Sequence, residues 1–189
     1  MTAREQEEYS ALRATIRERG TTRVWIFLVG LIAWGALTVA TAALASTPVA
    51  VLLPLLILSA AFEAVFTLHI GVERIGRYLQ VFYEDQDEDA SASAAAVGPR
   101  ASKKWEHAAM SFGRPAGAVA TDALFSIPFL IAALFNFAPV LVTNPIGVEL
   151  IFVGGAHALF VLRVIVARIA AGRQRAIDLE RFQQLKPGR

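Results

Sequence analysis

Cysteine is absent from this chain of 189 residues. Without thiols the chain cannot form disulfides, thiolate nucleophiles, cysteine-based zinc sites or iron–sulfur clusters. The motifs of phosphate-binding loops, serine hydrolases, zinc proteases and dinucleotide-binding domains are also missing. Serine, histidine and aspartate occur, but they fall on different sides of the expected membrane and form no triad. We therefore expect no catalytic residues and no enzyme activity, although a membrane enzyme with dispersed polar residues stays open.

Charged residues are scarce as well. Asp, Glu, Lys and Arg make up 18% of the chain, against 56% for the hydrophobic residues, which is too apolar for an ordinary soluble domain. The formal net charge is only +2. In so apolar a chain this small excess favours attraction to anionic lipid headgroups over binding of nucleic acid. We expect the lipid bilayer to be a partner and nucleic acid not to be one.

Four long apolar runs dominate the sequence. Each contains about the 20 residues that an α-helix needs to cross a bilayer. Only two residues separate the first run from the second, and two the third from the fourth, so each pair predicts a tight hairpin. The sequence thus predicts an all-α integral membrane protein with four transmembrane helices as two hairpins and cytosolic helical extensions. The expected spans are Val24–Ala45, Pro48–His69, Ala123–Val142 and Pro145–Val166.

The basic residues give the expected orientation. None of the 18 lysines and arginines lies in either hairpin turn. The positive-inside rule therefore places both termini and the central segment in the cytoplasm, in a multi-pass protein of the cell (inner or plasma) membrane. Aromatic and basic side chains at the span ends are expected to anchor the helices at the interfaces. These anchors are Arg23, Trp25, Trp105 and Arg163.

The remaining segments are polar. An amphipathic cytosolic helix is expected to end at Gly20, and the second helix to continue out of the membrane to about Tyr83. Pro128 and Pro139 predict a bent or locally unwound third span, in which Asn136 can satisfy freed backbone groups. The expected units are 1–22 (cytosolic helix), 23–83 (first hairpin with its extension), 84–101 (acidic, then Ala/Ser-rich linker), 102–118 (interfacial helix) and 119–189 (second hairpin with a basic C-terminal helix).

Two ionisable residues fall deep inside the expected spans. At ~1.5 Å per residue, Glu63 lies about 22 Å and His157 about 18 Å from the outer turns. Small residues flank both positions, and their spacing allows two helices to pack closely. We predict this packing at Ala60, Ala64, Gly154 and Ala158. It would bring Glu63 near His157, either as an ion or proton relay or, in the alternative interpretation, as a polar pair that only sets helix register.

No cofactor or metal is expected. His69 and His157 are the intramembrane histidines, but their depths differ by roughly 14 Å, too much for one haem iron. His107 could join His69, although nothing in the sequence positions it. The acidic run 84–89 lacks the spacing of a calcium-binding loop. A solvated helix end is the simpler interpretation, with loose divalent binding or pairing to the arginine-rich N-terminal helix as alternatives.

Two classes of function remain. The clustering of charged segments on one side favours a membrane-anchored scaffold or interaction module that binds a cytosolic protein through its cytosolic helices. The Glu63–His157 pair favours a small ion or proton channel or transporter instead. Four short spans enclose little room, so a pore would require a homo-oligomer, and we expect the chain to associate with copies of itself.

Overall fold

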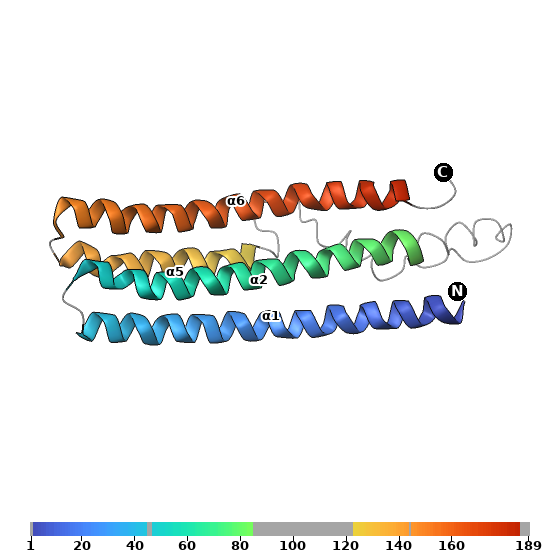
Figure 1. The fold of residues 1–189 in the computed structure, drawn as a ribbon, viewed down its shortest axis with the longest axis horizontal. Helices are drawn as coiled ribbons and strands as arrows, with labels where there is room; N and C mark the ends of the chain where they lie inside the picture. The colour runs from blue at the N-terminus through green and yellow to red at the C-terminus, as the bar shows by residue number, and fades with distance from the viewer. Residues whose placement is uncertain (1, 45–46, 85–122, 144, 186–189) are drawn as a thin grey trace.

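A computed structural model describes residues 2–44, 47–84, 123–143 and 145–185, and over these residues the protein is all-helical (Figure 1). Expected features in residues 85–122, including the interfacial helix and Trp105, lie outside the described residues. The α-helices are α1 (Ala3–Leu44), α2 (Leu52–Leu79), α5 (Ala123–Val142) and α6 (Gly147–Leu185). A 3₁₀ turn, η1 (Pro48–Val51), precedes α2, and a π-helical turn, η2 (Gln80–Glu84), follows it.

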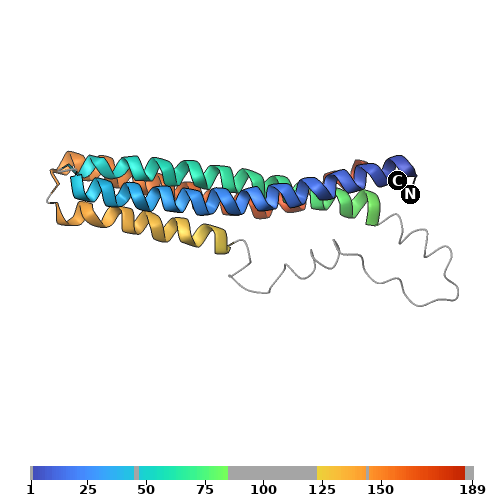
Figure 2. The ribbon, with the colours of Figure 1, turned by 90° about the horizontal axis from the view of Figure 1, so that it is seen from below.

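The helices lie side by side along one long axis (Figures 1 and 2). Both hairpins, α1–α2 and α5–α6, turn at the same end of the molecule, and both chain termini lie at the other end. In consequence α2 runs parallel to α6. The helix α5 covers only the half of the molecule that contains the turns, whereas α1, α2 and α6 continue beyond it (Figure 2).

Three of the helices are long and apolar enough to cross a membrane: α1, the helix from Pro48 to Tyr83, and α6. The apolar stretch Ser126–Val142 of α5 is shorter. At ~1.5 Å per residue, the 42 residues of α1 extend about 63 Å, roughly twice the ~30 Å hydrocarbon thickness of a bilayer. These lengths and compositions indicate a membrane protein.

The expected end of the first helix at Gly20 is wrong. The helix α1 continues without interruption from Ala3 to Leu44, so the cytosolic segment and the first span are one element. Glycine ends a helix where the chain must adopt a left-handed conformation, but inside a helix it costs only about 1 kcal/mol relative to alanine. The long apolar segment that follows keeps its backbone groups paired only by staying helical, and this outweighs one glycine.

The third and fourth helices need smaller corrections. The prolines of the third span predict a bent or locally unwound helix. The local unwinding is wrong, because α5 is a continuous helix through Pro128 and Pro139, with the expected bounds. The last helix begins at Gly147, two residues after the expected Pro145, and its extension to Leu185 is confirmed. The second helix also continues as expected, through η2 to Glu84.

The core is aromatic and lies between α2, α5 and α6. Phe62 of α2 contacts Phe129 and Phe160 edge-to-face, with ring centroids 5.4 and 6.1 Å apart. All three rings are buried, together with Leu58. In contrast α1 has no buried residue and packs on the surface of α2. This arrangement makes α1 a peripheral helix that packs along α2 and places Ile26, Phe27, Leu31 and Trp34 against the core.

Candidate functional site

A polar cluster in the turn-containing half joins α1, η1, α5 and α6. The side chain of Asn136 on α5 is fully buried. Its Nδ2 donates to the carbonyl of Val51 (2.9 Å) and to Nε2 of His157 (3.0 Å), and its Oδ1 accepts from Nε1 of Trp34 (3.3 Å). Asn136 therefore connects α1, η1 and α6 from its position on α5.

The carbonyl of Val51 lies where η1 passes into α2. The Asn136 amide donates a hydrogen bond to that carbonyl. The sequence predicted that Asn136 helps to satisfy backbone groups freed by the prolines of its own helix, but its amide binds a carbonyl of another segment.

The hydrogen bonds of His157 set its tautomer. Nδ1 lies 2.8 Å from the carbonyl of Val153, which can only accept, so Nδ1 carries the proton. Nε2 is then the acceptor for the Asn136 amide. Both ring nitrogens are occupied, and protonation at Nε2 would require the Asn136 amide to turn away and lose its bond to Val51. This environment suits a neutral, structural histidine.

Glu63 does not meet His157 in this arrangement. Its carboxylate forms a two-point ion pair with Arg163, with both N–O distances at 2.7 Å. The Arg163 guanidinium also lies over the ring of Phe66, 5.7 Å from its centroid. Arg163 is six residues beyond His157 on α6, about 9 Å further along the axis. The predicted relay pair is therefore two separate pairs, Glu63 with Arg163 and His157 with Asn136.

The predicted small-residue contact between α2 and α6 takes a different form. Ala60 and Ala64 line a shallow apolar groove between α1 and α2, and Ala158 is exposed. Gly154 lies against the ring of Phe137 on α5. The close contact between small residues is instead that of Gly30 on α1 with Ala61 on α2, where a side chain on Gly30 would collide with the Ala61 Cβ.

A second polar cluster lies where α1, α2 and α6 extend past α5. We call this part, residues 3–23, 69–84 and 170–185, the three-helix extension. Glu73 of α2 forms two contacts with Arg175 of α6 (2.6 and 3.0 Å). Asp178 of α6 accepts hydrogen bonds from Arg74 and Arg77 of α2, at 3.2 Å each. These ion pairs lock α2 and α6 in register.

Asp178 is the most buried acid of this cluster, with 5% of its surface exposed. Burial alone would raise the pKa of its carboxyl group, but hydrogen bonds from Gln174, Arg74 and Arg77 together lower that pKa below its ordinary value. Asp178 is therefore ionised at neutral pH. The helix α1 joins the same region through Arg23, whose guanidinium lies 2.8 Å from Nδ1 of His69.

Aromatic residues hold the far end of the extension together. Tyr78 contacts Phe82 and Phe182, with ring centroids 4.6 and 5.7 Å apart, and Tyr9 of α1 contacts Tyr83 at 5.5 Å. The Tyr78 hydroxyl donates to Glu8 of α1 at 2.9 Å. Burial and the Glu8 carboxylate raise the pKa of Tyr83 to about 12 and also raise that of Tyr78. The extension is thus a packed three-helix unit.

The expected interfacial anchors fall into two groups. Trp25 is exposed on α1, as an anchor to the membrane interface would be. Arg23 and Arg163 instead contact side chains of other helices.

Sequence reasoning missed the Glu73 and Asp178 ion pairs. The sequence carried one signal for these pairs. The polar ends of the second and the last helices each contain both acids and arginines, so ion pairs between the two helices were possible.

The chemistry available in these clusters is limited. Among the residues that the structure describes, no three metal-ligating side chains come together. Comparison of the chain with protein-family models, with curated proteins and with solved structures finds no significant match.

Proposed function

We propose that the protein is a multi-pass membrane protein whose three-helix extension is a preformed cytosolic docking module. The observation that carries this proposal is that the three-helix extension, beyond the half that α5 covers, has polar and aromatic contacts of its own. The extension is held by ion pairs between α2 and α6 and by an aromatic cluster that includes α1. A rigid helical surface binds a partner without the entropy cost of ordering it.

In this proposal four helices span the membrane, with both hairpin turns outside and both termini in the cytoplasm. The common position of the two termini at one end of the molecule supports it, as does the absence of lysine and arginine from the turns. The polar cluster around Asn136 lies among apolar helices and has its hydrogen bonds formed, as the interior of a bilayer demands.

The orientation can be tested directly because the chain has no cysteine. Single-cysteine variants Thr47→Cys, in the turn, and Ser10→Cys, on α1, provide a matched pair of exposed labelling sites. We expect a membrane-impermeant maleimide to label Thr47→Cys in intact cells, and Ser10→Cys only after permeabilisation. The reverse pattern would invert the topology, and labelling of both in intact cells would contradict it.

The docking function is tested by native mass spectrometry of the full chain after gentle extraction from its own membrane. We expect a cytosolic protein at fixed stoichiometry. The binding should weaken when exposed residues of the extension, Arg173 and Arg181, are both changed to Glu, because the change reverses the charge of that surface. The matched control, Thr143→Glu in the opposite turn, should bind normally. A protein that carries no partner in any preparation would overturn this function.

The alternative function, a small homo-oligomeric channel or transporter, has one observation in its favour. Glu63 and Arg163 are 46% and 44% exposed, although both lie within expected spans. Ionised groups facing lipid are costly, so a second copy that covers this pair would stabilise it. The occupied nitrogens of His157 argue against a relay through that residue.

Flux measurements on reconstituted liposomes separate the two functions. A channel that uses Glu63 predicts ion or proton flux above that of protein-free liposomes, and loss of this flux in Glu63→Gln. The docking function predicts no flux in either protein. The exposed substitution Thr67→Val, one turn along α2, is the matched control for effects on folding.

A further inference from the structure

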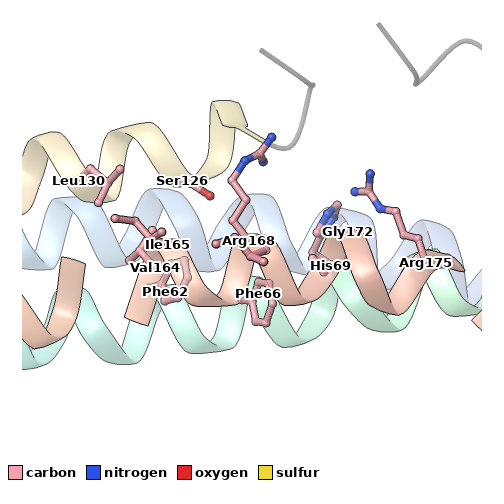
Figure 3. Close-up of a pocket in the computed structure, with 12 residues that line it drawn as sticks. Phe62, Phe66, His69, Ser126, Leu130, Val164, Ile165, Arg168, Gly172 and Arg175 are labelled. Atoms are coloured by element: carbon pink, nitrogen blue, oxygen red, sulfur yellow. The ribbon is translucent and has the colours of Figure 1, made fainter. Parts of the chain in front are cut away.

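A pocket of about 410 Å³ opens between α2, α5 and α6, at the level where α5 begins (Figure 3). Its deep walls are apolar and come from all three helices: Phe62 and Phe66 from α2, Leu130 from α5, and Val164 and Ile165 from α6. This volume and this lining are typical of sites that bind small apolar or amphipathic molecules.

The mouth of the pocket is cationic. His69, Arg168 and Arg175 line it on the side of the three-helix extension, and Figure 3 shows both guanidinium groups extending from α6 away from the apolar floor. Arg175 already holds Glu73. Arg168 is half-buried and has no carboxylate partner among the residues that the structure describes. A guanidinium at the mouth of an apolar cavity favours an anion as its partner.

The charge around the mouth of the pocket is also positive. The two acids of the adjacent cluster, Glu73 and Asp178, are each shared among several basic residues. Three arginines contact these two carboxylates, and Arg168 at the pocket mouth adds a fourth guanidinium nearby. The three are Arg74, Arg77 and Arg175.

We propose that this pocket binds one phospholipid of the inner leaflet whose headgroup carries a net negative charge. The phosphate would lie at Arg168, and the first part of an acyl chain would lie along Phe66, Leu130 and Ile165. Basic pockets between helices on the cytoplasmic side are the recurring form of such sites. A zwitterionic lipid fits less well because its own cation would face the arginines. The proposal depends on the membrane insertion proposed above.

The test is native mass spectrometry of the full chain in detergent, titrated with phosphatidylglycerol or with phosphatidylcholine of the same acyl chains. We expect one phosphatidylglycerol to be retained in preference to phosphatidylcholine. Arg168→Gln should weaken phosphatidylglycerol binding roughly fivefold and leave phosphatidylcholine binding almost unchanged, since it removes one charge near the membrane surface. Arg173→Gln, an exposed arginine of the same helix outside the pocket, is the matched control.

A second variant tests the apolar part of the site. Ile165→Trp places a larger side chain at a half-exposed position in the pocket wall, and we expect it to weaken binding of both lipids. Equal retention of the two lipids by the unchanged protein, or equal losses in the Arg168 and Arg173 variants, would overturn the proposal. Displacement of the lipid by millimolar inorganic phosphate would assign the site to a free anion instead.

Failure of this proposal is distinguishable from failure of membrane insertion. Flotation of the protein with liposomes measures insertion independently of headgroup preference. A chain that floats with liposomes of either composition but shows no preference in the titration is inserted and lacks the lipid site. A chain that does not float at all contradicts the proposed membrane topology itself.

Discussion

Asn136 shows how one side chain can join distant parts of a helical protein. The three helical segments that it contacts have apolar surfaces, and such surfaces alone give little preference for one register over another in lipid. Its four hydrogen bonds, to Trp34, Thr38, Val51 and His157, favour one register of these segments. We therefore assign to Asn136 and His157 a structural role in setting register.

This coupling is measurable by a double-mutant cycle. Asn136→Leu and His157→Leu should each destabilise the protein, because each leaves a buried polar partner unsatisfied. The double variant should lose less than the sum of the two, with a coupling energy of about 0.6–1.7 kcal/mol, as for hydrogen bonds between membrane helices. Denaturant unfolding in detergent gives the four stabilities. Additive losses would show that the hydrogen bond between them contributes nothing.

At the scale of the element, α1 shows why a breaker residue is not sufficient to end a helix. A Cβ placed on Gly20 would meet no atom within 4 Å, and the backbone there is not left-handed. Gly20 occupies an ordinary helical site, flanked by residues that carry the helix into the apolar segment. The polar and apolar parts of α1 therefore form one rigid rod.

A substitution distinguishes this rod from two helices with a break between them. Gly20→Ala should stabilise α1 by up to about 1 kcal/mol, because alanine has the higher helix propensity and meets no steric obstacle. If the chain turned at Gly20 in a left-handed conformation, the same change would be destabilising. Thermal unfolding followed by circular dichroism provides the comparison, and Gly35→Ala, equally unobstructed on the same helix, calibrates the propensity effect.

The ion pairs between α2 and α6 make the extension sensitive to acid. Since the folded-state pKa of Asp178 is lowered by its hydrogen bonds, its ionised form stabilises the fold above the unfolded pKa of about 3.9. This contribution is lost as the pH falls below about 4 and through the folded pKa. Asp178→Asn should therefore cost about 1–3 kcal/mol near neutral pH and less near pH 3, where part of the carboxylate is protonated.

The measurement is thermal unfolding of the two proteins at both pH values in one detergent. Glu180→Gln changes an exposed acid two residues away on the same helix and should show no comparable pH-dependent difference. An equal loss for Asp178→Asn at both pH values would mean that the carboxylate charge does not stabilise the extension.

At the scale of the whole molecule, α1 packs along α2 at the periphery of the core. The core belongs to α2, α5 and α6, and α1 contributes no buried residue. Its specific contacts include the close approach at Gly30, the hydrogen bond of Trp34, and contacts of Arg23 and Tyr9 within the extension. Because α1 also forms part of the extension, its attachment affects the proposed docking surface.

We predict that Gly30→Ala separates α1 from α2. The added methyl group would collide with Ala61, and overpacking of this kind typically costs about 1–3 kcal/mol. Gly35→Ala is the matched control, because it makes the same change on the same helix where no atom lies within 4 Å. Unfolding in detergent compares the two variants. If Gly30→Ala is as stable as Gly35→Ala, α1 is not held by this contact.

The sequence by itself determined that the described part of the chain is helical. The bounds of α5 and the continuation of the second and last helices past the apolar runs follow from runs of apolar residues and from breakers, which are local properties. Only the tertiary structure decided which side chains meet. Depth along a helix was countable, but the rotation and axial shift of each helix were not, so Glu63 pairs with Arg163 and His157 with Asn136. The same reason explains the contact of Gly30 with Ala61 and the burial of Asp178. A contact between two helices depends on depth, rotation and axial shift, and a sequence pattern gives only the depth.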